Sequence, residues 1–367
     1  MNSLPTLSCA AVFHAPGEPL TLEQFPIPAL EGGEVLVRIL CTTVCGSDLH
    51  TYYARRHSPT PSVLGHEIVG EIAAVGPAGA RQYRGELLSA GDRVTWSIVW
   101  SCGQCFFCQR GLRPKCERLM KYGHERITPG RELIGGLAEH CHLREGTAIF
   151  KVPENLPDVV ASPANCATAT VAAAFRNAGR CAGQAVVVQG AGMLGLTACA
   201  MAVAADASEV IALEPEERRR ELALQFGASA VLDSTRPEEE IRERVLGLTQ
   251  GRGADIGMEL SGSPAAIEAG IRLLREGGRF VMAGATFPAR PVRLSAEQLV
   301  RRMLHVIGVY NYQPEDLDCA LRFLARWRER FPFQALIGKA FRLRDVNEAF
   351  CYAERERPPR VAVIPEA

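Results

Sequence analysis

The pattern of apolar and polar positions divides the chain into regions of different periodicity. From Glu34 to about Pro153, short apolar runs such as EVLVRIL, EIVGEIAAVG and DRVTWSIVW are separated by Gly and Pro, and helical periodicity is weak. Runs of this kind predict short β-strands joined by turns. We therefore expect a compact, barrel-like β domain in this part of the chain.

After Gly179 the apolar runs alternate with helical segments. The runs are VVVQG, EVIALE, SAVLD, ADIGMEL and GRFVMAG, and an Ala-rich helix follows the first of them. Strands that alternate with helices predict βαβ units and a parallel sheet. From about Tyr310 helix and strand are mixed, and we place this stretch against the first domain. The expected domains are residues 1–170 with 310–367, which bind zinc, and residues 171–309, which bind a dinucleotide.

Composition and charge narrow the possible functions. The chain has 367 residues, more than one hydrophobic core usually serves, and its 41 basic and 41 acidic residues cancel. A neutral chain has no general attraction to nucleic acid or to an anionic membrane. The longest apolar stretch, Leu194 to Ala205, is too short to cross a bilayer, and the N-terminal segment lacks a secretion-signal pattern. We expect a cytoplasmic protein that binds neither nucleic acid nor a membrane.

Four of the thirteen cysteines form a compact motif. Clustered thiols in a cytoplasmic protein indicate metal binding rather than disulfides. The motif is C-x2-C-x2-C-x7-C, and four thiolates at this spacing can surround zinc and leave no open position. We predict a structural zinc site, with an iron cluster as the alternative. Its cysteines are Cys102, Cys105, Cys108 and Cys116. Basic residues close in sequence, which we expect to offset the thiolate charge, are Arg110, Arg113, Lys115 and Lys121.

A second set of possible ligands is dispersed along the chain. Cys45 lies in CGSDLH, His66 and Glu67 lie in GHE, and Cys166 lies in NCATAT. Two thiolates and one imidazole leave the fourth position of zinc open for a substrate oxygen, as in catalytic sites. Each residue alone is a weak indication, because a single His in a turn is more often structural. We also expect Asp48 to orient His66.

The segment VVVQGAGMLGL carries a dinucleotide-binding motif. Gly190, Gly192 and Gly195 follow an apolar strand and open a helix, whose N-terminus attracts a pyrophosphate. Glu214 ends the next strand, where a carboxylate can bind the adenosine ribose and repel a 2'-phosphate. This pattern predicts NAD. The alternative, NADP, depends on three arginines that follow Glu214 and could bind a phosphate: Arg218, Arg219 and Arg220.

Together these residues resemble the zinc-containing medium-chain dehydrogenase/reductase family over nearly the whole chain. The resemblance implies a chaperonin-10-like catalytic domain and a Rossmann domain inserted before its last segment, in a homodimer or homotetramer. It assigns Cys45, His66 and Cys166 as catalytic zinc ligands and Glu67 as an acid that can approach the metal. It also implies that Ser47 and His50 form a proton relay. Thr170 would lie beside the nicotinamide, and Arg360 would contact the pyrophosphate.

A narrower resemblance concerns the substrate. The segments SPANCATATVAAAFRNAG and TYYARRHSPTPSVLGHEIVG are similar to alcohol dehydrogenases associated with phosphonate catabolism. Arg55 and Arg56 follow the relay histidine, and arginine binds phosphonate or phosphate as a rigid fork. We hypothesise that the substrate is a small alcohol or aldehyde with an anionic group. The alternative is that both arginines face solvent.

The predicted reaction is hydride transfer between a small alcohol or aldehyde and NAD. Zinc lowers the pKa of a bound water from about 15.7 to about 7, and a bound alcohol should respond similarly. Ser47 and His50 would then carry the proton to solvent. The alternatives are a polyol dehydrogenase acting on neutral substrates, a zinc ribbon that binds nucleic acid, and a dinucleotide sensor without turnover.

Overall fold

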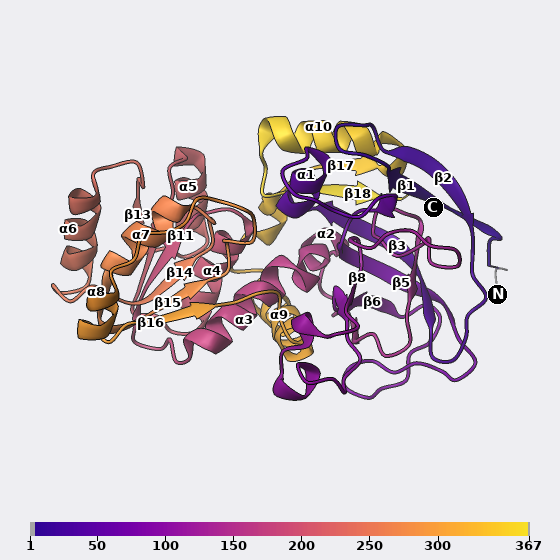
Figure 1. Cartoon of the computed structure of the whole chain (residues 1–367), viewed down its shortest axis with the longest axis horizontal. Coiled ribbons are helices and arrows are strands. Elements are labelled where there is room, and N and C mark those ends of the chain that lie inside the picture. Colours follow the sequence, from indigo (N-terminus) through magenta and orange to yellow (C-terminus); the bar gives the residue numbers. More distant parts are fainter. Residues whose placement is uncertain (1–3, 366–367) are drawn as a thin grey trace. The chain divides into compact units, whose positions relative to one another are not determined.

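The computed structural model describes residues 4–365, which form two compact units (Figure 1). Residues 1–3, the start of the segment inspected for a secretion signal, and residues 366–367, the end of the expected zinc-binding domain, lie outside the described residues. The first unit extends to Cys166 and includes Gln313–Ala325 and the chain from Phe333 onward, and the second comprises Ala167–Tyr312 and Arg326–Pro332.

The first unit is built on a seven-stranded sheet in which strands from distant parts of the chain meet. Its strand order is β10-β6-β5-β3-β18-β17, and β9 also pairs with β3. The C-terminal strand β18 lies antiparallel to β3 and parallel to β17, so the last segment of the chain completes this sheet. The strands are β3 (Val35–Val44), β5 (Glu67–Val75), β6 (Arg93–Trp96), β9 (His140–Leu143), β10 (Ile149–Lys151), β17 (Ile337–Arg342) and β18 (Arg360–Ile364).

Two smaller sheets complete the β structure of this unit. One has the order β2-β1-β4 and begins at Leu7, before the region in which the apolar pattern predicted strands. The other pairs β7 with β8 and carries the four-cysteine motif in the loop between them. Their strands are β1 (Leu7–Phe13), β2 (Thr21–Pro26), β4 (Ser62–Val63), β7 (Val99–Trp100) and β8 (Met120–Lys121).

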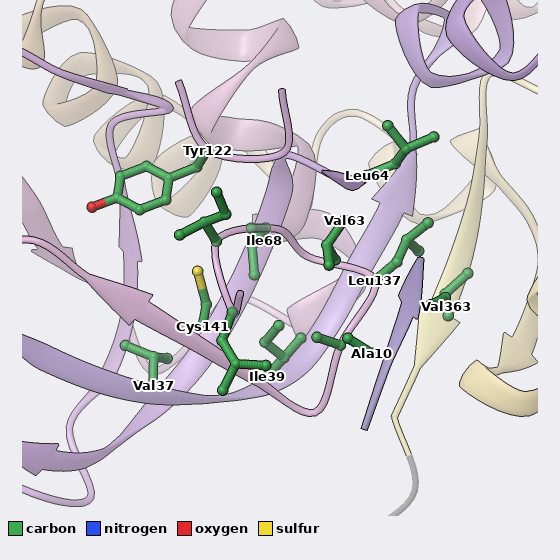
Figure 2. Packing of buried hydrophobic residues seen from close by; sticks show 14 of the residues in the cluster. Ala10, Val37, Ile39, Val63, Leu64, Ile68, Tyr122, Leu137, Cys141 and Val363 are labelled. Carbon is green, nitrogen blue, oxygen red and sulfur yellow. The ribbon is translucent and has the colours of Figure 1, made fainter. Parts of the chain in front are cut away.

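Apolar side chains from these sheets form the core of the first unit. Figure 2 shows Ile39 of β3, Ile68 of β5, Cys141 of β9 and Val363 of β18 packed together. All four are at most 2% exposed, and burial of such side chains is the main force that holds strands from distant segments together. The helices joined to these strands are α1 (Gly46–Tyr52), α2 (Asp158–Ala161), α9 (Pro314–Trp327) and α10 (Val346–Glu356).

The second unit contains a six-stranded sheet in the order β13-β12-β11-β14-β15-β16, with every pair parallel. The chain starts at the central β11, runs to one edge, and returns beside β11 to run to the other edge, which is the doubly wound order of the Rossmann fold (Figure 1). The strands are β11 (Ala185–Gln189), β12 (Glu209–Leu213), β13 (Ala230–Leu232), β14 (Ala254–Glu259), β15 (Leu274–Met282) and β16 (His305–Gly308).

The predicted α/β class is confirmed, and β16 is a strand that the apolar pattern did not single out. Residues in HVIG are largely exposed because β16 is an edge strand, so the run carries a weak apolar signal. Within residues 4–365, no helix has the length and apolarity needed to cross a bilayer. The helices of this unit are α3 (Ala167–Ala178), α4 (Met193–Ala204), α5 (Glu217–Gln225), α6 (Glu238–Leu248), α7 (Pro264–Arg272) and α8 (Ala296–Arg301).

Candidate metal centres and dinucleotide site

The dispersed ligands converge in the first unit. One ligand atom from each of Cys45, His66, Glu67 and Cys166 lies within 4.8 Å of the others. Cys45 caps the start of α1 and His66 precedes β5, while Cys166 follows the short 3-10 helix at Ser162–Asn165. Two sulfurs and one imidazole at this spacing suit a tetrahedral zinc with one open position.

The two sulfurs of this cluster show why a cation fits here. Interaction with Cys166 and the charge of Arg360 hold the pKa of Cys45 well below its usual value, although burial opposes this. The negative charge on Cys45, together with burial, holds the pKa of Cys166 well above its usual value. Without a cation, only one of the two sulfurs is therefore readily ionised. A divalent ion would stabilise both thiolates, so the residues present fit the metal that the sequence predicts.

Asp48, which the sequence analysis expected to orient His66, lies beside it. Asp48 Oδ2 accepts the amide hydrogen of Cys45 at 2.9 Å, and its Oδ1 lies 3.3 Å from His66 Nδ1. Burial disfavours the imidazolium of His66, but the Asp48 carboxylate and Cys45 outweigh it and raise the pKa of His66 to about 10. Because Nδ1 faces Asp48, Nε2 is the nitrogen that remains for a metal. Ser47 Oγ lies 3.3 Å from this Nε2.

Glu67 and Arg360 form a buried ion pair beside Cys45. Arg360 donates from Nε and Nη2 to the two carboxylate oxygens of Glu67, each at 2.6 Å, and Nη2 lies 3.4 Å from Cys45 Sγ. Thr43 Oγ1 also donates to Glu67 at 2.6 Å. Burial raises the pKa of Glu67, and Arg360 opposes that rise. The structure thus shows Arg360 bound to Glu67, while its contact with a pyrophosphate stays a prediction.

The remaining residues predicted for catalysis occupy two elements. Ser47 and His50 lie three positions apart on α1, a spacing that places them on one face of the helix. Burial and the positive charges of Arg55 and Arg56 lower the pKa of His50. Thr170 belongs to α3 and to the second unit.

The two adjacent arginines have different surroundings. Arg55 is exposed and pairs with Glu354 of α10. Arg56 is half-buried, donating from Nε to Thr51 Oγ1 at 2.8 Å and from Nη2 to His124 Nδ1 at 2.6 Å. The two arginines that we hypothesised to bind an anionic group therefore have different partners in this structure. His124 was not identified from the sequence, where it stands as a single His in an otherwise unremarkable loop.

The four cysteines of the compact motif also converge. Their sulfur atoms lie within 4.8 Å of one another, in the loop between β7 and β8. Backbone N–H groups point at the sulfurs: those of Gln104 and Cys105 lower the pKa of Cys102 to about 6, although the thiol's partial burial opposes this. The amides of Cys102 and Arg118 donate to Cys116 Sγ at 3.3 and 3.4 Å. Amides around four thiolates fit a closed structural metal site.

For Lys121, the expected role beside this motif is corrected. The sequence places Lys121 five residues after Cys116, and we expected it to offset the charge of the four thiolates. Instead, the charges that act on its ammonium group include those of Cys166, Cys45 and Asp48. Lys121 thus belongs with the first cluster, because β8 leads away from the motif toward His66.

The glycine motif forms the tight turn that close packing requires. Gly190 has a φ of +87°, and a Cβ on Gly195 would lie 1.7 Å from the carbonyl oxygen of Gly190. Gly192 caps α4 and has no atom within 4 Å of the position of a Cβ. Glu214 is buried and accepts the amide hydrogen of Ala191 at 2.6 Å, so the acid and the glycine turn are joined directly.

A cavity of about 550 Å³ opens beside this turn, within the second unit. Gly190, Gly192 and Glu214 line it together with two arginines, Arg219 and Arg236. Arg219 pairs with Glu216 at 3.0 Å, and Arg236 lies 3.9 Å from Asp233. Both arginines that line the cavity therefore have acidic partners.

Comparison with known proteins agrees with both units. Residues 31–154 match the alcohol dehydrogenase GroES-like domain, and residues 194–326 match the zinc-binding dehydrogenase family. An L-threonine 3-dehydrogenase from Pyrococcus furiosus is 34% identical over 295 residues, which cover 78% of each chain. That of Bacillus licheniformis is 33% identical over 308 residues, 82% of each chain.

Solved structures give the same result over the full length. An alcohol dehydrogenase from Thermotoga maritima has a TM-score of 0.92 and 32% identity, and the match covers 98% of this chain and 100% of that one. These matches favour the enzyme over the zinc-ribbon alternative, because they extend across both units. The chain therefore belongs to the zinc-containing medium-chain dehydrogenase/reductase family and is a zinc-dependent alcohol dehydrogenase.

Proposed function

We propose that the chain transfers a hydride between a small alcohol or aldehyde and NAD, at a zinc ion held by Cys45, His66 and Cys166. The observation that carries this proposal is the convergence of these three residues, which are far apart in sequence, within 4.8 Å. Glu67 lies in the same cluster and is neutralised by Arg360, so it is not one of the proposed resting ligands.

The chain itself supplies orientation and a route for the proton. When bound, zinc would polarise the alcohol oxygen and NAD would accept the hydride. Ser47, whose hydroxyl lies 3.3 Å from the proposed ligand nitrogen of His66, accepts the alcohol proton as it releases its own hydroxyl proton toward His50. His50, one turn further along α1, passes it to solvent, and its lowered pKa keeps the imidazole neutral and ready to accept a proton.

For the dinucleotide we propose NAD rather than NADP. The buried Glu214 carboxylate beside the glycine turn would repel a 2'-phosphate, and the nearby Arg219 is already paired with Glu216. Thr170 is proposed to lie beside the nicotinamide, and Arg360 to reach the pyrophosphate, from the family resemblance alone.

A second zinc is proposed for the four-cysteine motif. The four sulfurs and the amides that point at them leave no open position, so this ion would stabilise the loop between β7 and β8 rather than take part in the reaction. The proposal therefore requires two zinc ions per chain.

For the substrate we propose a small alcohol that carries an anionic group such as phosphonate. A second candidate is a β-hydroxy amino acid, because relatives 34% and 33% identical are named L-threonine 3-dehydrogenases. Neutral polyols remain the third class to test.

A substrate panel separates these candidates. Zinc-loaded enzyme would be assayed with NAD and with NADP against hydroxyalkylphosphonates, L-threonine, sugar alcohols and simple alcohols, while zinc per chain is counted. We expect NAD-dependent oxidation and two zinc ions per chain. Absence of turnover with every alcohol would contradict the proposed function.

Two histidine variants test the role of the cluster. His66→Gln should lose most of the activity and one zinc, because the imidazole ligand is removed. His57→Gln changes an exposed histidine near the same region and should retain both. Equal activity in the two variants would exclude the proposed zinc site.

The oligomeric state and the compartment are also proposals. We propose a homodimer or homotetramer, as the family resemblance implies, in the cytoplasm. All thirteen cysteines are free of disulfides in the structure, which is consistent with a reducing compartment.

A further inference from the structure

Arg56 and His124, whose side chains the proposed mechanism does not use, lie beside His66, and the charge of Lys121 acts on His124. Arg56 follows α1, Lys121 ends β8, and His124 lies in the next loop. The His124 ring centroid is 4.7 Å from that of His66, and Arg56 Nη2 is 2.6 Å from His124 Nδ1. We call Arg56, Lys121 and His124 the donor cluster.

The backbone holds this cluster against the proposed metal ligand. Gly123 has a φ of +74°, and a Cβ there would lie 2.3 Å from the Gly65 oxygen and 3.0 Å from His66 Cβ. The Gly123 amide also donates to the Ile134 oxygen at 2.8 Å. Only glycine allows the loop to approach this closely, so the fold itself brings His124 to His66. The Lys121 carbonyl, which accepts the His124 amide hydrogen at 3.1 Å, belongs to the same turn.

The contact with Arg56 determines which nitrogen of His124 carries hydrogen. A guanidinium group only donates, so Nδ1 of His124 must accept, and the ring hydrogen resides on Nε2. His124 is only 8% exposed, so water has little access to this Nε2–H group. The group has no hydrogen-bond partner among the described residues. Buried donors are rarely left without an acceptor, and such a group indicates a ligand or a water.

Lys121 adds a charge in the same place. Burial lowers the pKa of Lys121, as does the charge of Arg56, while the sulfurs of Cys166 and Cys45 act in the opposite direction. Its ammonium group therefore lies within electrostatic range of the metal-ligand cluster and of Arg56. A divalent ion bound by the cysteines would neutralise these sulfurs and make the surroundings of Lys121 and Arg56 more positive.

We propose that the donor cluster binds an anionic group of the alcohol substrate, a phosphonate, phosphate or carboxylate, and so places the hydroxyl at the proposed zinc. The inference rests on the proposed function, since it concerns the substrate of that site. A guanidinium, an ammonium and an imidazole N–H are all donors, and an oxyanion accepts from all three. Arg55 is not part of this cluster, because it pairs with Glu354.

The other explanation is structural. In this explanation Arg56 braces α1 against the loop that contains His124 and has no role in recognition. A brace affects every substrate alike, whereas an anion subsite affects only anionic ones. The kinetic comparison therefore needs substrates that differ in the charged group and share the alcohol.

The experiment compares three alcohols with zinc-loaded enzyme and NAD: 2-hydroxyethylphosphonate, 3-hydroxypropanoate and propan-1-ol. In Lys121→Gln and in Arg56→Gln we expect kcat/KM for the preferred anionic alcohol to fall at least about tenfold, mainly through KM, because a charge-assisted hydrogen bond is lost. For propan-1-ol, assayed at a pH well above the acidic limb that Arg56 affects through His50, the change should stay below about twofold. A loss confined to the phosphonate, or to the carboxylate, identifies which oxyanion the cluster binds.

A matched control is Arg126→Gln, which removes an exposed arginine from the same loop. This variant should leave the preference for anionic alcohols over propan-1-ol unchanged. It thereby controls for the effect of removing one positive charge from the protein. Equal losses for propan-1-ol and the anionic alcohols in both Lys121→Gln and Arg56→Gln would overturn the proposal, as would a wild-type enzyme without preference for the anionic alcohols. Zinc content and the thermal unfolding midpoint establish that each variant is folded.

A binding measurement separates this inference from the proposed function. Ethylphosphonate has the anionic group without a hydroxyl, and its binding to the enzyme–NADH complex can be measured by calorimetry. We expect binding that weakens at least about tenfold in Lys121→Gln. Enzyme that binds ethylphosphonate in this way but oxidises no alcohol would contradict the proposed function alone. Enzyme that oxidises propan-1-ol but does not bind ethylphosphonate would contradict the subsite alone.

Discussion

At the scale of single residues, the neighbours of each ionisable group in the first unit determine its charge. His50 lies partly buried beside two arginines, which lowers its pKa. His66 faces Asp48 and Cys45, which overcome its burial and raise its pKa to about 10. Two histidines of one site are thus suited to different tasks, one to exchange protons and one to be held in place.

The lowered pKa of His50 predicts a pH dependence. If neutral His50 accepts the alcohol proton, kcat/KM for alcohol oxidation falls as pH decreases through the His50 pKa, below its ordinary value of about 6.5. Arg55→Gln removes one positive charge that lowers this pKa, so the acidic limb should move to higher pH. The measurement is the pH profile of kcat/KM. In His50→Gln this limb should disappear, and an unmoved limb in Arg55→Gln would contradict the assignment.

The buried pair of Glu67 and Arg360 predicts coupled effects on stability. Arg360→Met leaves the Glu67 carboxylate buried without its charge partner, and we expect the free energy of unfolding to fall by about 3–5 kcal/mol. The double variant Glu67→Gln with Arg360→Met should regain much of this loss, because no buried charge remains. Denaturant unfolding of Arg360→Met, Glu67→Gln, the double variant and the wild type measures the coupling. Strictly additive losses would show that the pair does not act as a unit.

At the scale of secondary-structure elements, short connections between strands and helices position the residues of the candidate sites. Cys45 lies at the junction of β3 with α1. The side-chain amide of Asn165 donates to the Trp96 carbonyl at 2.9 Å, which holds the segment that ends at Cys166. In the second unit, the turn between β11 and α4 joins the glycine motif to Glu214. Each connection relies on glycine or on a buried polar side chain.

Two glycines of that turn should respond differently to alanine. In Gly195→Ala the new Cβ would lie 1.7 Å from the Gly190 oxygen, so the turn must distort and the second unit should unfold more readily without cofactor. In Gly192→Ala the Cβ has no neighbour within 4 Å, so the stability without cofactor should stay near that of the wild type. The expected defect of Gly192→Ala is weaker NAD binding, since the backbone must approach a pyrophosphate.

Thermal unfolding without cofactor and calorimetric titration with NADH measure these two effects. Identical behaviour of the two variants would show that the steric difference at the turn is unimportant.

At the scale of the whole molecule, the two chemical tasks belong to different units. The metal-ligand clusters lie in the first unit, and every residue that lines the cavity beside the glycine motif lies in the second. The chain crosses between units at Cys166 and Ala167, so a proposed zinc ligand is followed directly by the second unit.

This division predicts that zinc removal and dinucleotide binding are separable. Treatment with a chelator should abolish alcohol oxidation as the zinc of the first cluster is lost, while NADH affinity changes by less than about threefold, because the cavity residues are untouched. Metal analysis and NADH fluorescence titration of the same samples are the measurements. Restoring zinc to chelated enzyme should restore turnover. Loss of NADH binding in step with zinc would contradict the separation.

The features that the sequence predicted well are local ones. The glycine motif, its strand and helix, and Glu214 lie within 30 residues, and the four cysteines lie within 15, so spacing alone indicates their chemistry. The alternation of strands and helices likewise predicted a parallel sheet. The strands β2 and β16 were not predicted, because a strand with little buried surface leaves little pattern. The early strand β1 was also not predicted, although most of its residues are buried.

By itself, then, the sequence determined the two-domain α/β organisation, the dinucleotide motif and the cysteine motif, because each depends on neighbours along the chain. Only the tertiary structure decided that Cys45, His66 and Cys166 meet, that Arg360 binds Glu67, and that Arg56 turns inward while Arg55 does not. It also decided that Lys121 acts at the first cluster. The physical reason is that side-chain direction and long-range contact are set by packing of the core, which no local periodicity specifies.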